Sequence, residues 1–305
     1  MNISDLKIIF KQFENNIIFN ADLKKKNWFN IGGKAKIYFK PTDLKDLIKF
    51  LKILDNREKI HVIGAGSNTL ITDELFDGVI IKLGKNFNHI SALSQDVIIS
   101  GAAVTDRKLS EFAAENNLSG FEFLSCIPGT VGGGIKMNAG CFGNEIKDIL
   151  LSIQVVDRFG NISLIPSSQI NFEYRGNNIS DDLIFLSASF KGKNEDSKII
   201  LEKMKKLKVQ KDINQPSKIK TSGSTFKNPK DKKAWELIKD SNCNLLSFGK
   251  ASISKKHCNF FVNEGGASSK DIEKLIESVR QKVFQKHNVK LELELKIIGE
   301  TNNNG

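Results

Sequence analysis

The amino-acid sequence predicts an α+β protein on two observations. Short runs of β-branched and apolar residues alternate along the chain with amphipathic segments whose apolar residues recur at helical spacing. Three successive strand-like runs between residues 149 and 190 are joined by polar turns, which favours antiparallel pairing. With 305 residues, the chain is long enough for two domains, each with its own apolar core.

Residues 1–195 form the first predicted domain. A strand at 36–40 ends at Pro41, and a helix with apolar residues at helical spacing follows at 43–52. A short buried strand at 60–63 runs straight into a glycine-rich turn. The other expected elements are strands at 78–83 and 97–100, a helix at 109–116, and antiparallel strands at 149–156, 163–166 and 183–190.

Residues 196–305 form the second predicted domain. It opens with a lysine-rich helix at 198–211, whose inner face is expected to carry Leu201, Met204 and Leu207. The other expected elements are a helix at 234–240, strands at 251–253 and 260–262, a helix at 269–287 that starts at the N-cap signal of Ser268, Ser269 and Asp271, and a closing strand at 290–298.

The charge of the chain is uneven. Lysine and arginine outnumber aspartate and glutamate by 46 to 35, which gives a formal net charge of +11. Residues 198–233 alone hold 12 basic and three acidic side chains, and such a patch favours a polyanionic partner such as a nucleic acid. The segment lacks interleaved aromatic residues, and no known nucleic-acid-binding module is present. A basic surface serves small anionic ligands equally well, and that is the interpretation we prefer.

Several other classes of protein are excluded. No run of about 18 apolar residues is present, so we expect no membrane-spanning helix. The N-terminus has an early acidic residue and lacks the apolar segment of a secretory signal, which predicts a cytoplasmic protein. The four cysteines have neither CxxC spacing nor a paired histidine motif, so we expect reduced thiols and no metal site; they are Cys126, Cys141, Cys243 and Cys258.

The first motif that carries chemistry is Ile63-Gly-Ala-Gly-Ser-Asn-Thr-Leu70, directly after a strand. Its glycines allow backbone amides to approach a ligand closely, and such a turn can form a nest of N–H groups for a pyrophosphate. It is not the Rossmann dinucleotide fingerprint, because the third glycine and the following long helix are missing. On these residues alone, a turn without a ligand is the commoner interpretation.

The second motif is Ile127-Pro-Gly-Thr-Val-Gly-Gly-Gly-Ile-Lys-Met-Asn-Ala-Gly140. Glycine is unfavourable in regular structure, so this density indicates backbone packed against something flat or anionic. A merely flexible loop would be richer in serine and aspartate, and would not carry Val131, Ile135 and Met137. Ligand contact is therefore favoured over a plain packing turn.

Two weaker motifs follow. Ser222-Gly-Ser-Thr-Phe-Lys-Asn-Pro229 presents a hydroxyl, a lysine and an amide that suit oxyanion or phosphate contacts, but a polar turn before a helix is equally consistent with it. Phe172-Glu-Tyr-Arg175 offers an arginine that could bind a carboxylate or lie in a surface ion pair. Alternation in the run 289–297 places Glu292 and Glu294 on one strand face, for which solvation is the default expectation.

Together these strings resemble the UDP-N-acetylenolpyruvoylglucosamine reductase family, in register over nearly the whole chain. The matching strings are Asn27-Trp-Phe-Asn-Ile-Gly-Gly33, Gly64-Ala-Gly-Ser-Asn68, Gly129-Thr-Val-Gly-Gly133 through Asn138-Ala-Gly140, Tyr174-Arg175, Gly223-Ser-Thr-Phe-Lys-Asn-Pro229, Ser254-Lys-Lys-His-Cys-Asn-Phe-Phe-Val-Asn263 and Glu294. The resemblance implies an FAD-binding region of the vanillyl-alcohol-oxidase type, made of two α+β subdomains split near residues 90–100, followed by an α+β substrate-binding domain. The length resembles the shorter subtype that lacks an extra tyrosine-bearing loop.

The resemblance also implies a reaction: an NADPH-dependent flavoenzyme reduces an enolpyruvyl sugar nucleotide in peptidoglycan synthesis. Ser224 would donate the proton, and Arg175 and Glu294 would hold and polarise the enolpyruvyl carboxylate. Substrate contacts would come from Tyr174, Lys227, Asn228 and His257. Noncovalent FAD would be held by Gly64, Ala65, Gly66, Ser67, Asn68, Thr69, Pro128, Gly129, Thr130, Gly132, Gly133, Asn138, Ala139 and Gly140.

Some positions depart from the family pattern. Trp28 replaces a small residue, and Glu292 lies two residues before Glu294, so the choice between these glutamates rests on spacing. No histidine occupies the position expected for a covalent flavin link. The alternative is another FAD-dependent oxidase or dehydrogenase on the same flavin fold. In either case we expect a monomer that binds small molecules, and neither nucleic acid nor membrane.

Overall fold

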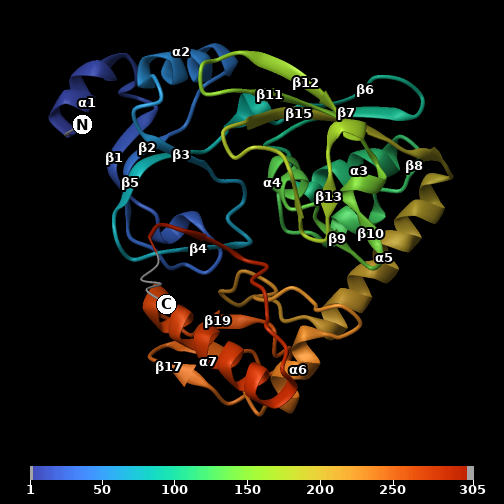
Figure 1. The fold of residues 1–305 in the computed structure, drawn as a ribbon. Coiled ribbons are helices and arrows are strands. Elements are labelled where there is room, and N and C mark those ends of the chain that lie inside the picture. The colour runs from blue at the N-terminus through green and yellow to red at the C-terminus, as the bar shows by residue number, and fades with distance from the viewer. Residues whose placement is uncertain (1–2, 301–305) are drawn as a thin grey trace. The chain divides into compact units, whose positions relative to one another are not determined.

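The computed structural model describes residues 3–300 (Figure 1). These residues form two compact units that interleave along the sequence. The first unit includes residues up to 19, 36–65 and 77–211, and the second includes 20–35, 66–76 and the residues from 212 onward. Two short segments of the N-terminal half thus belong to the second unit, which a division of the chain at residue 195 does not capture.

The first sheet of the chain has four strands in the order β1 (Ile17–Asp22), β2 (Lys34–Phe39), β5 (Phe76–Ile81) and β3 (Lys59–Val62). β3 runs parallel to β5, with Ile60 opposite Val79. The helices beside it are α1 (Ile3–Ile9) and α2 (Leu44–Leu54), and α2 starts where the Asp43 side chain accepts from the N–H of Asp46. These elements share an apolar core that includes Phe39 stacked on Phe50.

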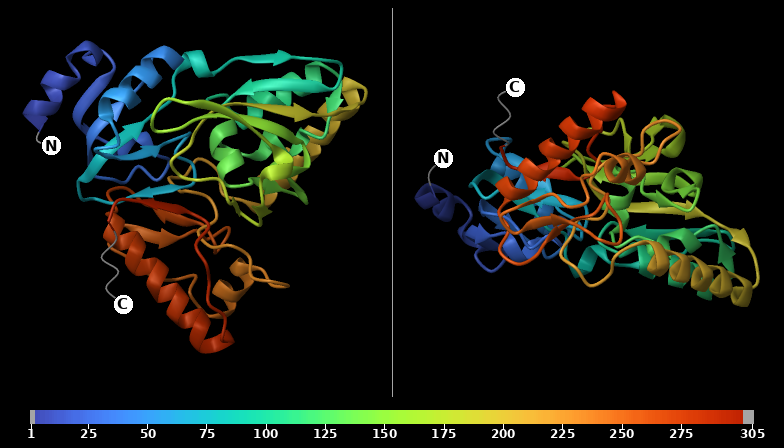
Figure 2. Two further views of the ribbon diagram at one scale, coloured as in Figure 1. Left: turned by 45° about the horizontal axis from the view of Figure 1, so that its top comes forward. Right: turned by 90° about the horizontal axis from the view of Figure 1, so that it is seen from below.

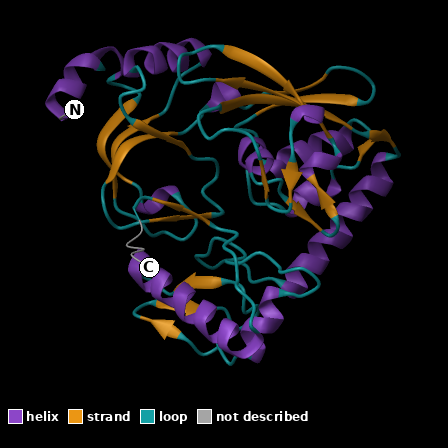
Figure 3. Cartoon of the chain, in the orientation of Figure 1, coloured by secondary structure: helices purple, strands orange, loops and turns teal. Residues whose placement is uncertain are grey.

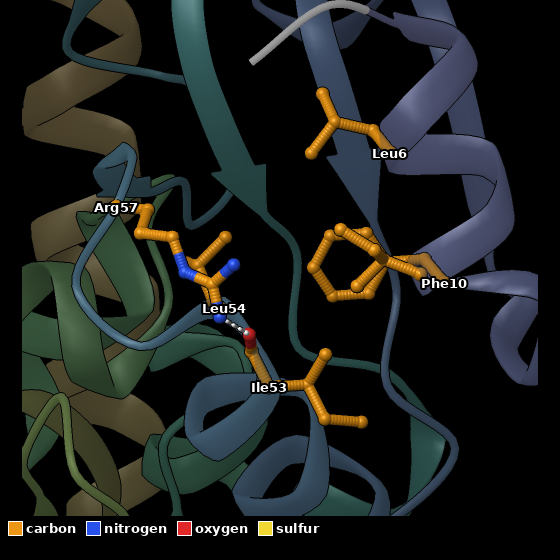
Figure 4. A pocket seen from close by; sticks show the side chains of 6 residues that line it. Leu6, Phe10, Ile53, Leu54 and Arg57 are labelled. Carbon is orange, nitrogen blue, oxygen red and sulfur yellow. Dashed lines mark hydrogen bonds between the residues drawn. The ribbon is translucent and has the colours of Figure 1, made fainter.

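An apolar hollow lies beside α1 and α2 (Figure 4). It is lined by Leu6, Ile9, Phe10, Ile53, Leu54 and Arg57. The Arg57 guanidinium donates to the Ile53 carbonyl at 3.2 Å, so the polar end of the arginine side chain is bonded to the backbone of its own segment. None of the predicted site residues lines the hollow.

The second sheet of the first unit has five antiparallel strands. Their order is β12 (Ile162–Pro166), β11 (Leu150–Val156), β15 (Ile184–Lys191), β7 (Val97–Gly101) and β6 (Ile90–Ala92), which confirms the antiparallel pairing predicted between residues 149 and 190. Its core is shared with α3 (Asp106–Glu115) and α4 (Val131–Lys136). Figure 3 draws the helices of the chain purple and the strands orange. Short pairs complete the unit: β8 (Leu118–Ser119) with β16 (Lys193–Asn194), β9 (Gly140–Cys141) with β10 (Asn144–Glu145), and β13 (Phe172–Glu173) with β14 (Gly176–Asn177).

The second unit is built around α7 (Ser269–His287), which is predicted to the residue. A capping box between Ser268 and Asp271 starts this helix, as the sequence indicates. The unit also contains α6 (Ala234–Asp240) and a sheet of β17 (Ser247–Phe248), β18 (Ala251–Ile253) and β19 (Phe261–Asn263). Its remaining strands are β20 (Lys296–Ile298) and β4 (Thr69–Ile71), which pair in parallel. Figure 2 shows the ribbon from two further sides. One apolar core joins these elements.

Two details of the prediction are wrong. In α5 (Ser197–Asn214) the buried residue is Ile200, whereas Leu201, expected on the inner face, is 51% exposed. The run 290–298 is a strand only at 296–298, although Leu291 and Leu295 are buried as its alternation predicts. Among the described residues, no helix is both long and apolar enough to cross a membrane.

Candidate active site

The turn after β3 presents a row of unpaired backbone donors. Within residues 3–300, no hydrogen-bond acceptor is found for the N–H groups of residues 64–68. Gly66 has φ +68°, a conformation that favours glycine, and an added Cβ there would lie 2.6 Å from the Lys26 carbonyl oxygen. Unpaired N–H groups on successive residues are what a bound anion requires, so the turn fits the predicted pyrophosphate nest.

The second glycine-rich motif contacts the first turn within the first unit. A Cβ added to Gly64 would lie 2.5 Å from Thr130 Oγ1 and 3.9 Å from the Cα of Gly133. The motif was not expected to be helical, yet residues 131–136 form α4, whose Gly132 packs against Ala102. The N–H groups of Gly129, Thr130 and Gly133 also have no acceptor in the described chain.

Lys82 adds a positive charge to this place. Its ammonium group donates to the Gly64 carbonyl, so a cation lies beside the unpaired N–H groups. Lys82 directly follows β5, and a lysine after a strand was too weak a signal to single out in the sequence. Within the first unit, the N–H groups of residues 64, 65, 129, 130 and 133 and the Lys82 ammonium fit the predicted contact with a pyrophosphate.

Near the end of the second motif, the buried Asn138 side chain forms hydrogen bonds with neighbouring segments. Asn138 is fully buried with φ 42°, and its side-chain amide donates to Glu145 Oε2 and to the Glu173 carbonyl, both at 3.0 Å. Its Oδ1 accepts from the Lys147 N–H at 3.1 Å. These contacts give Asn138 a supporting role in the segment, and direct contact of this residue with the cofactor stays a prediction.

Arg175 forms a hydrogen bond with the same segment. It lies with Tyr174 in the turn between β13 and β14, at φ 62°, and its Nη2 donates to the Gly140 carbonyl at 2.8 Å. Its guanidinium lies 4.7 Å from the centre of the Tyr174 ring, and its Nη1 lies 3.8 Å from Glu145 Oε1. The structure therefore brings the predicted arginine to the end of the predicted cofactor segment. Sequence reasoning missed Glu145, because one glutamate in a turn carries no spacing signal.

A buried acid lies under the second motif. Asp106, at the start of α3, is 0% exposed, and neither carboxylate oxygen has a hydrogen-bond partner among the described residues. A Cβ added to Gly129 would lie 2.3 Å from its Oδ2, and one added to Gly134 would lie 3.2 Å from its Oδ1. Burial raises the pKa of Asp106 to about 8, because the interior disfavours the charged form.

Ser224 lies in the second unit, on an extended segment that pairs with two other stretches of backbone. It forms a bridge with Phe260, and two residues later Phe226 forms one with Leu293. The segment is fixed by Asn259, whose side chain accepts from the Phe226 N–H at 3.0 Å and donates to the Phe226 carbonyl at 2.8 Å. Ser224 is partly exposed, whereas the following Thr225 is fully buried.

The backbone brings Glu294 beside this segment. Its N–H donates to the Thr225 carbonyl at 2.9 Å, and its carbonyl accepts from the Asn68 side chain at 3.1 Å. Glu294 is partly buried, whereas the Glu292 side chain is 77% exposed and lies 3.5 Å from the Lys227 ammonium. Position therefore favours Glu294 over Glu292 as the functional glutamate.

The remaining predicted substrate residues also belong to the second unit. Asn228 Oδ1 accepts from the Ala234 N–H at 3.0 Å, so this side chain holds the start of α6. His257 packs edge-on against Phe260, with ring centres 4.8 Å apart, and burial lowers the pKa of its imidazole. The neutral ring is therefore favoured, and Lys227 is the cation among these three residues.

Two family models match consecutive parts of the chain. Residues 35–164 match the FAD binding domain family, and residues 215–298 match the family described as UDP-N-acetylenolpyruvoylglucosamine reductase, C-terminal domain. The first match includes both glycine-rich motifs, and the second includes Ser224 and Glu294.

Relatives and a solved structure extend the likeness to the whole chain. The UDP-N-acetylenolpyruvoylglucosamine reductase of Pelagibacter ubique is 56% identical over 98% of this chain and 100% of its own length. That of Rickettsia akari is 46% identical over 92% of this chain and 94% of its own. The crystal structure of UDP-N-acetylenolpyruvylglucosamine reductase from Thermus caldophilus has a TM-score of 0.81 at 29% identity, and the match covers 93% of this chain and 98% of that one. The chain belongs to the UDP-N-acetylenolpyruvoylglucosamine reductase family, whose members are FAD-binding oxidoreductases.

Proposed function

We propose that this protein uses NADPH and FAD to reduce the enolpyruvyl group of UDP-N-acetylenolpyruvoylglucosamine to UDP-N-acetylmuramate in peptidoglycan synthesis. The observation that carries the proposal is full-length likeness to a named reductase at 56% identity. The unpaired N–H groups of the glycine-rich motifs support it independently, because they suit a dinucleotide cofactor.

The cofactor-binding residues belong to the two glycine-rich motifs. The backbone of residues 64 and 65, together with that of Gly129, Thr130 and Gly133 in the same unit, would hold the pyrophosphate through N–H donors. Lys82 would add a positive charge beside Gly64. When bound, FAD supplies the hydride chemistry that no amino-acid side chain provides.

The protein's own side chains would handle charge and the proton. Hydride addition to the methylene carbon builds negative charge on the neighbouring carbon and its carboxylate, so a cation at that carboxylate lowers the barrier. We assign this role to Arg175, with Glu294 as the second polar group at the substrate. Ser224 would deliver the proton to the neighbouring carbon. A serine hydroxyl is a weak acid, so this step needs the developing charge and a site from which water is excluded.

The substrate and both cofactors are anions, which gives the basic composition a role without a nucleic acid. Lys227 is the predicted substrate residue with a formal positive charge, and Tyr174, Asn228 and His257 are the uncharged ones. We further propose that the enzyme acts as a monomer in the cytoplasm on small molecules alone.

Steady-state kinetics test the proposal. NADPH oxidation by the FAD-loaded enzyme should depend on the enolpyruvyl sugar nucleotide, with one NADPH consumed for each UDP-N-acetylmuramate formed. Oxygen consumption with a free sugar and no use of the enolpyruvyl nucleotide would instead identify a flavin oxidase. Failure to bind FAD would contradict both.

A further inference from the structure

Glu145 lies at the centre of a side-chain network that joins Arg175 to the glycine-rich segment. One of its carboxylate oxygens, Oε1, lies 3.8 Å from Arg175 Nη1. The other, Oε2, accepts from the Asn138 amide at 3.0 Å and lies 2.8 Å from the Lys147 ammonium. The Glu145 side chain is 19% exposed and the Arg175 side chain 16%, so this pair is largely shielded from water, whereas the Lys147 side chain is 44% exposed.

We propose that Glu145 is a positioning residue for Arg175 in the reduction described above. The proposal rests on that function and adds a residue to it. Glu145 holds the guanidinium in the direction in which it meets the substrate carboxylate, and it does so from an anchor inside the cofactor segment.

The backbone of Arg175 explains why an anchor is required. Arg175 occupies a left-handed turn position between two-residue strands, which constrain its side chain little. An arginine side chain has many rotamers and loses much of this conformational freedom when it is fixed. The Gly140 carbonyl binds Nη2 at 2.8 Å, and Glu145 orients the other arm of the fork.

The anchor itself is rigid. Asn138 is fully buried and holds Glu145 Oε2, and the Glu145 N–H donates to Asp148 Oδ2 at 2.8 Å at the start of the next helical turn. A guanidinium carries five N–H donors in a planar fork, so Arg175 can contact Gly140, Glu145 and an incoming carboxylate together. The 3.8 Å separation makes the interaction between Glu145 and Arg175 weaker than a direct bidentate pair. A weaker pair suits Arg175, because its guanidinium must also bind the substrate carboxylate.

Glu145→Gln tests the proposal because it keeps the size and an acceptor for Asn138 while it removes the charge. Substrate binding to the FAD-loaded, oxidised enzyme is measured by calorimetry, and flavin reoxidation by substrate is measured in single turnovers. We expect E145Q to weaken substrate binding and slow reoxidation about tenfold, the size of one charge-assisted contact. Flavin reduction by NADPH should change less than about twofold, and FAD content should match that of wild type.

A double-mutant cycle separates positioning from a structural effect. In an Arg175→Ala background, E145Q should cause no further loss of substrate binding, because Glu145 acts through the missing guanidinium. Glu111→Gln is the matched control, since Glu111 lies in an exposed pair with Arg107 at 2.7 Å. Equal losses in both backgrounds, or loss of FAD from E145Q alone, would overturn the proposal. So would a wild-type value for E145Q. If the wild-type enzyme itself fails to bind or reduce the sugar nucleotide, the proposed function is wrong.

Discussion

The N–H of Glu294 donates to the carbonyl of Thr225, the residue directly after Ser224, at 2.9 Å. Glu294 and Thr225 lie 69 positions apart in the sequence and are thereby neighbours in the second unit. Asn259 braces the same segment from its other side, so the position of Ser224 is set by backbone hydrogen bonds and by a buried amide.

Ser224→Ala should separate the two halves of the reaction. Flavin reduction by NADPH should be unchanged, and reoxidation by the substrate should slow by about 100-fold or more, the range for loss of a general acid. Rapid-mixing absorbance measurements report each half-reaction. Unchanged reoxidation would show that another group donates the proton.

Glu294→Gln and Glu292→Gln form a matched pair on one segment. The first should slow reoxidation by substrate, because it removes the charge of a partly buried group next to the Ser224 segment. The second removes the charge of an exposed side chain whose pair with Lys227 contributes about 1 kcal/mol or less to stability. Steady-state kcat and KM of both variants test the assignment, and a larger loss in Glu292→Gln would reverse it.

Gly133→Ala tests the cofactor segment. An added Cβ would meet only Thr130 Oγ1 at 3.5 Å within the protein, so the folded chain should accept it. Gly133 is also exposed and its N–H is unpaired, so we expect the methyl group to obstruct FAD and weaken its binding at least tenfold. Thermal unfolding of the apoprotein and FAD titration distinguish the two effects. Gly176→Ala is the control, since an added Cβ there would meet no protein atom within 4 Å. Equal FAD affinity in both variants would place the cofactor elsewhere.

The buried carboxyl group of Asp106 should make the stability of the protein depend on pH. Its pKa rises from 3.8 in the unfolded chain to about 8 in the folded one, so between these values the folded state binds an extra proton. Stability should therefore fall as the pH rises from 4 to 8, with a contribution of up to about 1.4 kcal/mol per pH unit. Asp106→Asn should remove this contribution and make the protein more stable than wild type near pH 8. Denaturant unfolding at several pH values measures it, and parallel curves for the two proteins would contradict the prediction.

Local signals in the sequence predict much of the fold. The capping box at Ser268 and the helical spacing after it locate α7 to the residue, because both signals lie within the helix itself. By contrast, Ile200 and Leu201 are both apolar, and which one faces inward depends on the surface that receives the helix. The run 290–298 shows the same limit, since Glu292 and Glu294 bond to the backbone of Lys227 and Thr225 instead of joining a regular ladder.

The residues of the candidate site also differ in how far the sequence alone predicts them. Glycine-rich strings are enough to predict cofactor segments, because glycine is unfavourable in regular structure and a high density of it therefore carries information. Lys82 and Glu145 escape prediction, because each acts through a contact that only the folded chain creates, with Gly64 and with Arg175. No periodicity or spacing marks such residues.

The most direct test of the central claim is an anaerobic titration of the FAD-loaded protein. NADPH should bleach the visible absorbance of the flavin, and the enolpyruvyl sugar nucleotide should restore it with formation of UDP-N-acetylmuramate. Absorbance that the nucleotide leaves bleached, and that only oxygen restores, would contradict the account.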